Sequence, residues 1–314
     1  MPEAEPRQSR AIEVEGLVRE FKGVRAVDGI DLRVSEGEIY GFLGPNGAGK
    51  STTVLMLTTL LPPTAGTARV AGYDVAREGN RVRASIGAAL QEAALDSYLT
   101  GREHIKLQGA MHGMPRKERK RRGEELLERV GLTEAADRKV GGYYGGMKRR
   151  LDLALALLHG PEILFLDEPT TGLDPQARHL VWEKLRELKS RGKTLILTTH
   201  YMDEAAQLCD RLVIMDGGRI ISEGTPTELI EDNVSPEVVE FRAGPKDLDR
   251  LEPVVGAEAD HIERTANAIY AYTADPDALL QRVNGSVEDA GETLRRGSGL
   301  EDVFLNLTGR GLVD

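Results

Sequence analysis

The sequence predicts an α/β protein built on a parallel sheet and followed by a smaller α+β unit. Three short apolar runs, each closed by glycine or by polar residues, are typical of buried strands: 38–44, 162–168 and 194–200. The segment 175–192 lies between the last two runs and repeats its apolar residues at helical spacing. A strand, a helix and a strand in this order predict parallel strands joined by right-handed crossovers.

Local signals place the other elements of this first part. The segment 50–61 predicts a helix that the prolines at 62–63 stop. Gly192 suits the C-cap of the helix at 175–192. Within 212–224, two apolar runs are joined through Asp-Gly-Gly, which is a hairpin signal.

The pattern changes after about residue 225, where short strand-like and helix-like segments alternate. Their βαββαβ order, followed by a last helix, indicates a ferredoxin-like unit. None of these segments has the spacing of a catalytic or metal site. The predicted segments are a strand at 237–244, a helix at 245–256, a hairpin at 259–274, a helix at 276–284, a strand at 286–296 and a helix at 299–309.

Composition and charge disfavour several classes of protein. The formal net charge is −10, whereas a general nucleic-acid binder usually carries a basic excess. No apolar run reaches the roughly 18–20 residues that cross a membrane, and the polar N-terminus is not typical of a secretory signal. Cys209 is the single cysteine, so no internal disulfide can form and a reducing cytosol is expected. The basic run at 115–122 predicts a solvated helix face, with contact to acidic lipid head groups or to a partner as the alternative.

The motif GPNGAGKST fits G-x-x-x-x-G-K-[ST], a phosphate-binding loop, and lies between a predicted strand and a predicted helix. Its glycines let several backbone N–H groups converge on one anion, and the helix adds its positive N-terminal end. Lys50 can reach the β- and γ-phosphates, and the hydroxyl of Ser51 can ligate Mg²⁺. The predicted contacts are Gly44, Pro45, Asn46, Gly47, Ala48, Gly49, Lys50, Ser51 and Thr52.

A second group of polar residues ends two further predicted strands. Asp167 and Glu168 close one of them, at the carboxyl edge where open α/β sheets bind ligands. Asp167 would hold Mg²⁺ through water, and Glu168 would polarise an attacking water. His200 ends the next strand and can hydrogen-bond the γ-phosphate and the same water. Taken singly, Asp167 and Glu168 would more often be solvated acids and His200 a structural histidine. The phosphate loop upstream favours a role for all three in a nucleotide site.

The stretch KVGGYYGGMKRRLDLA at 139–154 contains a glycine pair at the start of another predicted helix. Together with the motifs above, it resembles the ATP-binding-cassette (ABC) family over residues 12 to about 224. The resemblance rests on GPNGAGKST, Gln91, YYGGMKRR, LFLDEP, TGLDP and His200. The whole chain is similar to ATP-binding subunits of ABC-2-type exporters, especially the daunorubicin/doxorubicin-resistance type. Its ending, GLEDVFLNLTGRG, resembles the acidic-aromatic C-terminal motif of that group.

The resemblance implies roles for further residues. Phe21 would stack on adenine. Gln91 would contact Mg²⁺ and water and relay the state of the site to a membrane partner, and Asp174 would contact an opposing subunit. Two cassettes, as a homodimer or a heterodimer, would enclose two ATP molecules, each between one phosphate loop and the other subunit's glycine pair. The implied catalytic residues are Glu168, His200, Lys50 and Gln91, and the implied metal contacts are Ser51, Gln91 and Asp167.

The glycine-pair turn departs from the family pattern at Tyr144, where a serine usually donates to the γ-phosphate. Tyrosine places its hydroxyl a whole ring further out, so that contact is lost. The backbone N–H groups of Gly145, Gly146 and Met147 remain, so the turn is expected to stay competent. The alternatives are pairing with a different cassette and an impairing change.

The resemblance also divides the chain. We expect a disordered lead-in at 1–11 and an ATP-binding domain at 12–225, with an antiparallel β subdomain and a helical subdomain at about 95–160. The C-terminal domain at 226–314 would serve dimerisation or regulation, with a passive stabilising appendage as the alternative.

The implied function is ATP hydrolysis that powers export of a drug, lipid or polysaccharide-like substrate through a separate ABC-2-type membrane permease. The chain would lie in the cytoplasm, on the inner face of the cell membrane, and no nucleic-acid partner is expected. The alternative is a non-transport ABC ATPase acting on ribosomes or DNA, but such proteins usually carry two cassettes, and this chain has no internal repeat. A small-molecule kinase would leave Gln91, the GLDP motif and His200 unexplained.

Overall fold

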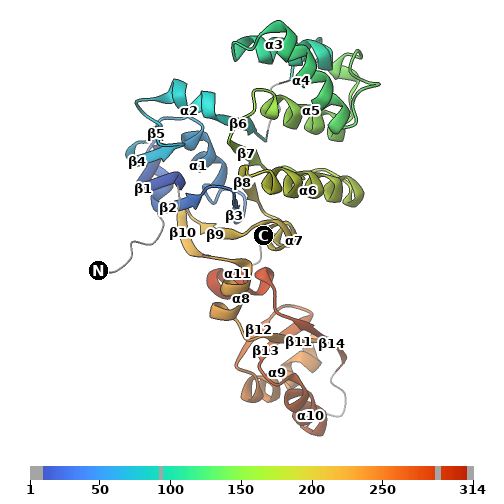
Figure 1. The fold of residues 1–314 in the computed structure, drawn as a ribbon. Helices are drawn as coiled ribbons and strands as arrows, with labels where there is room; N and C mark the ends of the chain where they lie inside the picture. Colours follow the sequence, from blue (N-terminus) through green and yellow to red (C-terminus); the bar gives the residue numbers. More distant parts are fainter. Residues whose placement is uncertain (1–9, 92–94, 287–290, 310–314) are drawn as a thin grey trace, which may run out of the picture. The chain divides into compact units, whose positions relative to one another are not determined.

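The computed structural model describes residues 10–91, 95–286 and 291–309. The chain forms two compact units, which divide between Glu223 and Gly224. The first is an α/β unit with a largely parallel sheet, and the second is a small α+β unit (Figure 1). The fold class predicted from the sequence is therefore confirmed.

A six-stranded sheet lies at the centre of the first unit, in the order β10-β9-β3-β8-β7-β6. β3 runs parallel to both β8 and β9, and β7 runs parallel to both β8 and β6. Every residue of β3, β7 and β8 is buried, which is why these segments are largely apolar runs. The strands are β3 Ile39–Leu43, β6 Ile86–Ala89, β7 Ile163–Asp167, β8 Thr194–Thr199, β9 Arg211–Asp216 and β10 Arg219–Gly224.

A second sheet of the first unit is antiparallel and has the order β2-β1-β4-β5. Its apolar residues share one core with the central sheet and with α1; Leu17, Ile30, Phe42 and Leu57 are all buried in it. The strands are β1 Arg10–Phe21, β2 Val24–Ser35, β4 Ala65–Val70 and β5 Tyr73–Asp74.

Three helices of the first unit, α3, α4 and α5, lie together and share a core of their own (Figure 1). Thr100 and Glu103 form a capping box at the start of α3, which fixes where that helix begins. The basic run at 115–122 forms the start of α4, where Arg121 pairs with Glu125. The helices of this unit are α1 Lys50–Leu57, α2 Gly79–Ser85, α3 Gly101–Met111, α4 Arg116–Arg129, a 3₁₀ turn Val140–Gly142, α5 Gly145–Leu157, α6 Pro175–Ser190 and α7 Met202–Leu208.

The second unit has a four-stranded antiparallel sheet in the order β12-β13-β11-β14. With helices α9 and α10 between the strands, this is the βαββαβ order of a ferredoxin-like arrangement. Val239, Phe241 and Leu248 belong to its buried core, and α11 packs on α8. The elements are α8 Pro226–Asn233, β11 Glu237–Arg242, α9 Pro245–Glu258, β12 His261–Arg264, β13 Ala268–Thr273, α10 Pro276–Ser286, β14 Glu292–Gly297 and α11 Leu300–Thr308.

Several predicted boundaries are wrong, most of them by one or two residues. Arg10 and Ala11 belong to β1, because they pair with neighbouring strands, whereas the rest of the predicted lead-in, residues 1–9, lies outside the described residues. The helix predicted at 50–61 ends at Leu57, since the backbone at Thr59 takes a left-handed φ of 66°. The strand predicted at 286–296 begins at Glu292; residues 287–290 lie outside the described residues.

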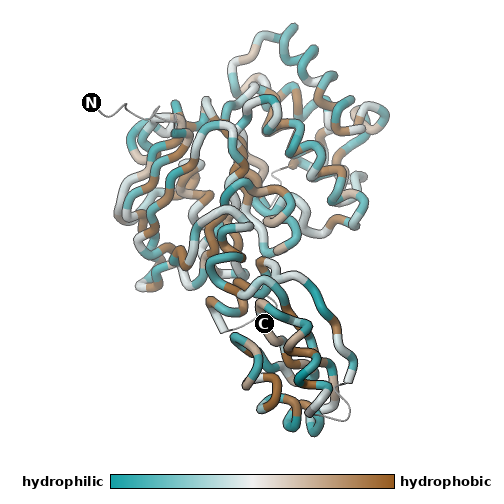
Figure 2. The backbone as a smooth tube through the Cα atoms, turned by 60° about the horizontal axis from the view of Figure 1, so that its bottom comes forward, coloured by the Kyte–Doolittle hydropathy of each residue, from teal (hydrophilic) through white to brown (hydrophobic). Residues whose placement is uncertain are grey.

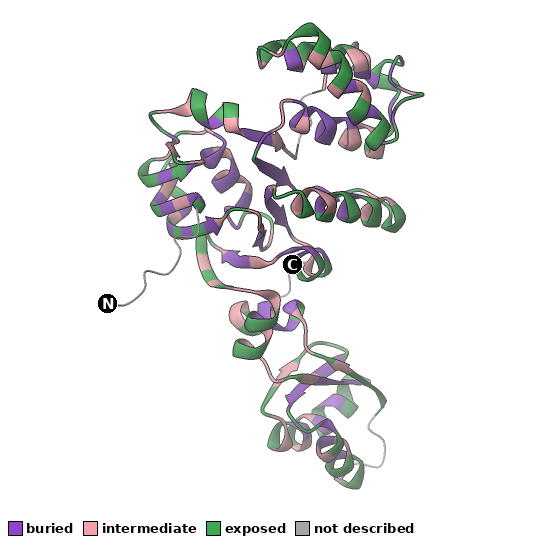
Figure 3. Cartoon of the chain, viewed as in Figure 1, coloured by how far each residue is buried: buried purple, intermediate pink, exposed green. Residues whose placement is uncertain are grey.

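The inner strands of the sheets are the most buried, namely β3, β7 and β8 in the first unit and β11 and β13 in the second. Figure 2 shows hydrophobic and hydrophilic stretches alternating along the backbone, and Figure 3 shows exposed residues along helices such as α4 and α6. Among the residues that the structure describes, no helix is both long and apolar enough to span a membrane.

Candidate functional site

The phosphate loop joins β3 to α1 at the carboxyl edge of the central sheet. Its glycines are required by geometry. Gly44 and Gly49 have φ values of 158° and 102°, and a Cβ at these positions would lie 2.2 Å from the carbonyl oxygen of Met215 and 2.5 Å from that of Ala26. The loop therefore keeps its curled form only with glycine at both positions. Its N–H groups and the N-terminal end of α1 supply an anion-binding surface.

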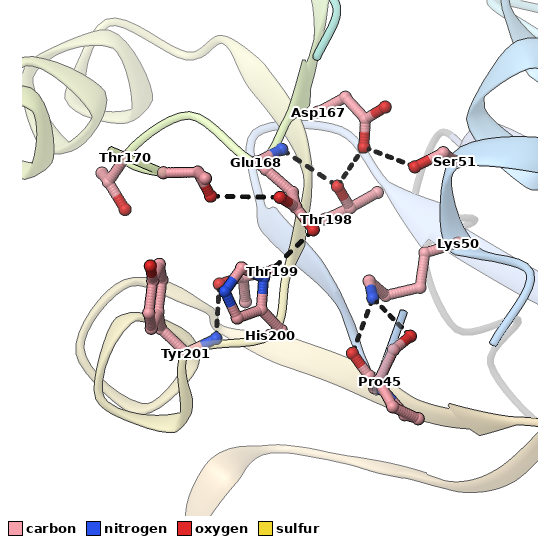
Figure 4. A network of polar contacts seen from close by, with 12 residues as sticks. Pro45, Lys50, Ser51, Asp167, Glu168, Thr170, Thr198, Thr199, His200 and Tyr201 are labelled. Carbon is pink, nitrogen blue, oxygen red and sulfur yellow. Dashed lines mark hydrogen bonds and ion pairs between the residues drawn. The ribbon is translucent and has the colours of Figure 1, made fainter. Parts of the chain in front are cut away.

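Lys50, the first residue of α1, is 5% exposed, and its ammonium group bends back over the loop. Its Nζ donates to the carbonyl oxygens of Gly44 at 2.6 Å and Pro45 at 2.9 Å (Figure 4). Burial lowers the pKa of Lys50, and the charges of Glu168 and Asp167 oppose that shift. The ammonium thus lies against the start of the phosphate loop, where phosphate oxygens can replace its two carbonyl partners.

The structure brings two predicted metal contacts together. Ser51 Oγ, on α1, donates to Asp167 Oδ1, at the end of β7, over 3.0 Å. Thr198, on the neighbouring strand β8, donates to the same carboxylate oxygen (Figure 4). A hydroxyl and a carboxylate at one point, beside a phosphate loop, are the oxygen donors that Mg²⁺ prefers. The residues present therefore fit this ion.

The second pair at this edge is Glu168 and His200. His200 Nδ1 lies 3.1 Å from Glu168 Oε1 (Figure 4). Thr171 donates to the other carboxylate oxygen at 3.1 Å. Glu168 is 8% exposed and takes a left-handed φ of 48°, which is rare for a residue other than glycine. Its N–H donates to Thr198 Oγ1 at 3.0 Å, so β8 holds the backbone in this conformation. Such outliers persist only where the surroundings fix them, and they cluster at functional sites.

Other predicted contacts lie apart from these two pairs. Phe21 is 42% exposed, at the end of β1, with the Arg19 guanidinium 4.5 Å from its ring centroid. Gln91 is exposed and lies two residues after the end of β6. Asp174 caps α6 by accepting a hydrogen bond from the Ala177 N–H at 2.9 Å. Within the described residues, no hydrogen bond or ion pair is shown between any of these three and the phosphate loop, so their predicted roles stay predictions.

The glycine-pair turn starts α5, and its surface is open. Tyr144 is the N-cap residue, 81% exposed, and its side chain makes no capping hydrogen bond. Neither glycine has a positive φ. A Cβ at Gly145 would meet nothing within 4 Å, and one at Gly146 would meet only Leu173, at 3.6 Å. Nothing in the described fold therefore requires glycine at these two positions. A group that approaches the turn closely from outside the chain would be a reason for having no side chain here.

Three residues that sequence reasoning missed support the site. Thr198 joins both pairs, and its only signal was a polar residue inside an apolar run. Glu204, on α7, is fully buried and accepts from Thr170 at 2.8 Å and from Trp182 at 3.0 Å, which links the loop after β7 to α6 and α7. Arg149, on α5, donates to the carbonyl oxygen of Asp167. No pattern of spacing predicts contacts between such distant segments.

A glycine loop feeding a helix, with acidic and hydroxyl side chains at the ends of adjacent parallel strands, defines a nucleoside-triphosphate-binding protein of the phosphate-loop class. A family model described as "ABC transporter" matches residues 27–171, and one described as "Nodulation factor export protein NodI, C-terminal domain" matches residues 249–309. A third, described as an AAA domain of putative AbiEii toxin, matches residues 145–202.

Curated relatives match almost the whole chain. It is 44% identical to the Nod factor export ATP-binding protein I of Burkholderia lata over 96% of this chain and 98% of that protein. It is also 44% identical to the daunorubicin/doxorubicin resistance ATP-binding protein DrrA of Streptomyces peucetius, over 96% of this chain and 93% of that protein. The chain therefore belongs to the ABC transporter family, as an ATP-binding subunit.

Solved structures give the same result for the first unit. An ATP-binding subunit of an ABC transporter has a TM-score of 0.66 at 30% identity and covers 71% of this chain and 92% of its own. A dimeric ATP-binding cassette in a post-hydrolysis state, bound to ADP and Pi, has a TM-score of 0.64 at 26% identity and covers 68% of this chain and 98% of its own. The predicted resemblance to the ABC family and to its daunorubicin-resistance members is confirmed, and so is the prediction of an ATPase.

Proposed function

We propose that this chain powers an exporter of the ABC-2 type by hydrolysing ATP on behalf of a separate membrane permease. The observation that carries the proposal is the meeting of Ser51 with Asp167 and of Glu168 with His200 at one edge of the sheet, beside the phosphate loop. Relatives named for Nod factor export and for daunorubicin resistance support the export role. They also support a drug, lipid or polysaccharide-like substrate. The chain would act at the inner face of the cell membrane.

The phosphate loop and Lys50 would bind the triphosphate of ATP. The loop's N–H groups and the α1 N-terminus are fixed before binding, so little reorganisation is needed. Lys50 would leave the carbonyl oxygens of Gly44 and Pro45 for the β- and γ-phosphates.

Ser51 and Asp167 would hold Mg²⁺, with Gln91 as a further contact by family resemblance. When bound, this ion neutralises charge on the phosphate oxygens. In the described residues, Thr198 also donates to Asp167 and keeps its carboxylate aimed at Ser51.

Glu168 would orient and polarise the attacking water. Its carboxylate is nearly buried and keeps one oxygen on His200 and the other on Thr171. As the water attacks the γ-phosphorus, the bond from that phosphorus to the bridging oxygen breaks and ADP leaves. Glu168 accepts the proton of the water, and His200 hydrogen-bonds the γ-phosphate. Both side chains are positioned before ATP arrives, which lowers the orientation cost of the step.

A second cassette would complete each site. In this arrangement Gly145 and Gly146 of one chain approach the γ-phosphate held by the other, Phe21 stacks on adenine, and Asp174 contacts the opposing chain. The open surface at Gly145 supports this, and one structural neighbour is a dimer bound to ADP and Pi. ATP binding would close the pair and hydrolysis would reopen it, with the permease converting that motion into export.

The test is Glu168→Gln, which keeps the size of the side chain but removes its basicity. ATP hydrolysis should fall by about 10²- to 10⁴-fold, while ATP binding persists and an ATP-stabilised dimer elutes on size exclusion. Glu183→Gln, an exposed glutamate on α6, is the matched control and should hydrolyse ATP at the native rate. Hydrolysis by Glu168→Gln at the native rate would remove Glu168 from the catalytic role.

A further inference from the structure

Arg149 connects three segments of the first unit through one side chain. It lies on α5, whose first two residues are the glycine pair. Its guanidinium donates to the carbonyl oxygens of Leu90 at 2.6 Å and Asp167 at 2.6 Å, and to that of Pro169 at 3.3 Å. Only 15% of the side chain is exposed.

The three carbonyls flank residues of the proposed reaction. Leu90 directly precedes Gln91, and Asp167 and Pro169 lie on either side of Glu168. One guanidinium therefore holds the backbone of both segments. Its planar fork can donate in several fixed directions at once, whereas a lysine ammonium at the same place cannot reproduce that set.

The buried charge of Arg149 has a partner on its own helix. Asp152 Oδ2 lies 3.3 Å from the guanidinium, and 12% of that side chain is exposed. Burial raises the pKa of Asp152 to about 6, and the charge of Arg149 acts in the opposite direction. Arg149 is buried and is bound to one carboxylate and three carbonyl oxygens, so breaking these contacts would cost free energy. A shift of α5 should therefore move the three carbonyl groups with it.

The neighbouring arginine provides a contrast. Arg150 also donates to three carbonyl oxygens, those of Val130 at 2.8 Å, Gly146 at 3.3 Å and Gly131 at 3.4 Å. All three lie within the group formed by α3, α4 and α5 and its turns. Arg150 thus holds that group together internally, whereas Arg149 joins it to Leu90, just after β6, and to Asp167, at the end of β7.

We infer that Arg149 is a positioning residue that couples the glycine-pair turn to the segments carrying Gln91 and Glu168. When the turn engages a phosphate, the displacement of α5 reaches both segments through this guanidinium. The inference rests on the proposed function: within one chain, Arg149 links the segments of that chain's own ATP site to the turn that serves the site of the opposing chain. Arg149 acts through the backbone it holds, because its guanidinium donates to the carbonyl oxygens of Leu90, Asp167 and Pro169 and to its partner Asp152.

The experiment compares Arg149→Lys, Arg149→Gln and the matched Arg150→Lys in the full chain. For both Arg149 variants, kcat should fall by about 10- to 100-fold because misplaced groups lose near-attack geometry. The KM for ATP should stay near the native value because the phosphate loop is untouched. Arg150→Lys should keep most of the native kcat, even if its melting temperature falls as far as those of the Arg149 variants.

Hydrogen exchange supplies a readout that does not depend on turnover. A non-hydrolysable ATP analogue should protect the segment 86–91 in the native chain and in Arg150→Lys, and this protection should disappear in Arg149→Lys. Native kcat in Arg149→Lys, or equal losses of kcat in Arg149→Lys and Arg150→Lys, would overturn the coupling role. A native chain that hydrolyses no ATP would instead overturn the proposed function, and the inference with it.

Discussion

Tyr144 leaves the glycine-pair turn without a side-chain donor at its usual place. The ring is 81% exposed and its hydroxyl caps nothing. At the start of α5, the Met147 N–H donates to the carbonyl oxygen of Tyr144 at 3.0 Å, whereas the described structure shows no hydrogen bond for the N–H groups of Gly145 and Gly146, which remain available to an anion. The structure therefore supports a turn that works through its backbone.

Replacing Tyr144 by serine tests whether backbone donors suffice. We expect Tyr144→Ser to hydrolyse ATP at close to the native rate, measured at saturating ATP. A regained hydrogen bond to a charged group would be worth about 1.5–3 kcal/mol, or a gain of about tenfold or more in rate. A gain of that size would favour an impaired site or pairing with a different cassette.

A substitution at Gly145 should affect ATP hydrolysis without lowering the stability of the fold. Because its φ is not positive and its Cβ position is empty, Gly145→Ala should leave stability unchanged or raise it by about 0.4–1 kcal/mol. The added methyl group should hold a phosphate away from the turn and lower the ATPase rate by about tenfold or more. Urea unfolding followed by the fluorescence of Trp182, the single tryptophan, reports the first effect.

Gly142→Ala is the control for that variant. It lies in the same stretch, a Cβ there would meet only the Arg138 side chain, at 3.9 Å, and its φ is not positive. It should match Gly145→Ala in stability and the native chain in rate. Equal ATPase rates for the two alanine variants would argue against a close approach of phosphate to Gly145.

At the scale of elements, the features predicted best from the sequence were those that depend on neighbouring residues in the chain. The buried parallel strands were visible as apolar runs, and their order fixed the edge where Asp167, Glu168 and His200 meet. The phosphate loop was visible because its glycines serve backbone geometry. The hydrogen bonds of Thr198 and Arg149 were not predictable, because each joins segments far apart in the chain and depends on side-chain direction.

The acidic-aromatic motif at the C-terminus packs α11 in the described structure. Asp302 is fully buried and takes a bidentate pair from Arg296, at 2.6 and 2.7 Å. It also accepts from Tyr272 at 3.2 Å and from the Gly299 N–H at 2.8 Å. Phe304, two residues on, is fully buried. Both parts of the motif thus have a structural use within the second unit.

Removing the carboxylate of Asp302 should destabilise the second unit. Asp302→Ala leaves Arg296 partly buried without its partner, and we expect a loss of about 3 kcal/mol, the low end for a broken buried pair because Arg296 still reaches water. Thermal unfolding by calorimetry measures it. Glu301→Ala, the exposed neighbour on α11, should change stability by less than about 0.5 kcal/mol; similar losses for both would contradict a specific role for Asp302.

At the scale of the whole molecule, the proposed ATP site belongs to the first unit. The residues assigned to it lie between Phe21 and His200, whereas the second unit begins at Gly224. A family model named for the C-terminal domain of a Nod factor export protein matches residues 249–309. We propose that this unit supports dimerisation or regulation, since it contributes none of the proposed catalytic groups.

A chain that ends at Thr225 tests whether the second unit supports dimerisation while the first unit binds ATP. It should bind a fluorescent ATP analogue with near-native affinity, because the phosphate loop, Asp167 and Glu168 are all retained. In the Glu168→Gln background, the truncated chain should form less of the ATP-stabilised dimer on size exclusion than the full chain does. Full-length Glu168→Gln carrying Asp302→Ala should weaken the dimer in the same direction, because it loosens the second unit without removing it. If the truncated chain dimerises with ATP as well as the full chain, residues 226–314 do not support the dimer.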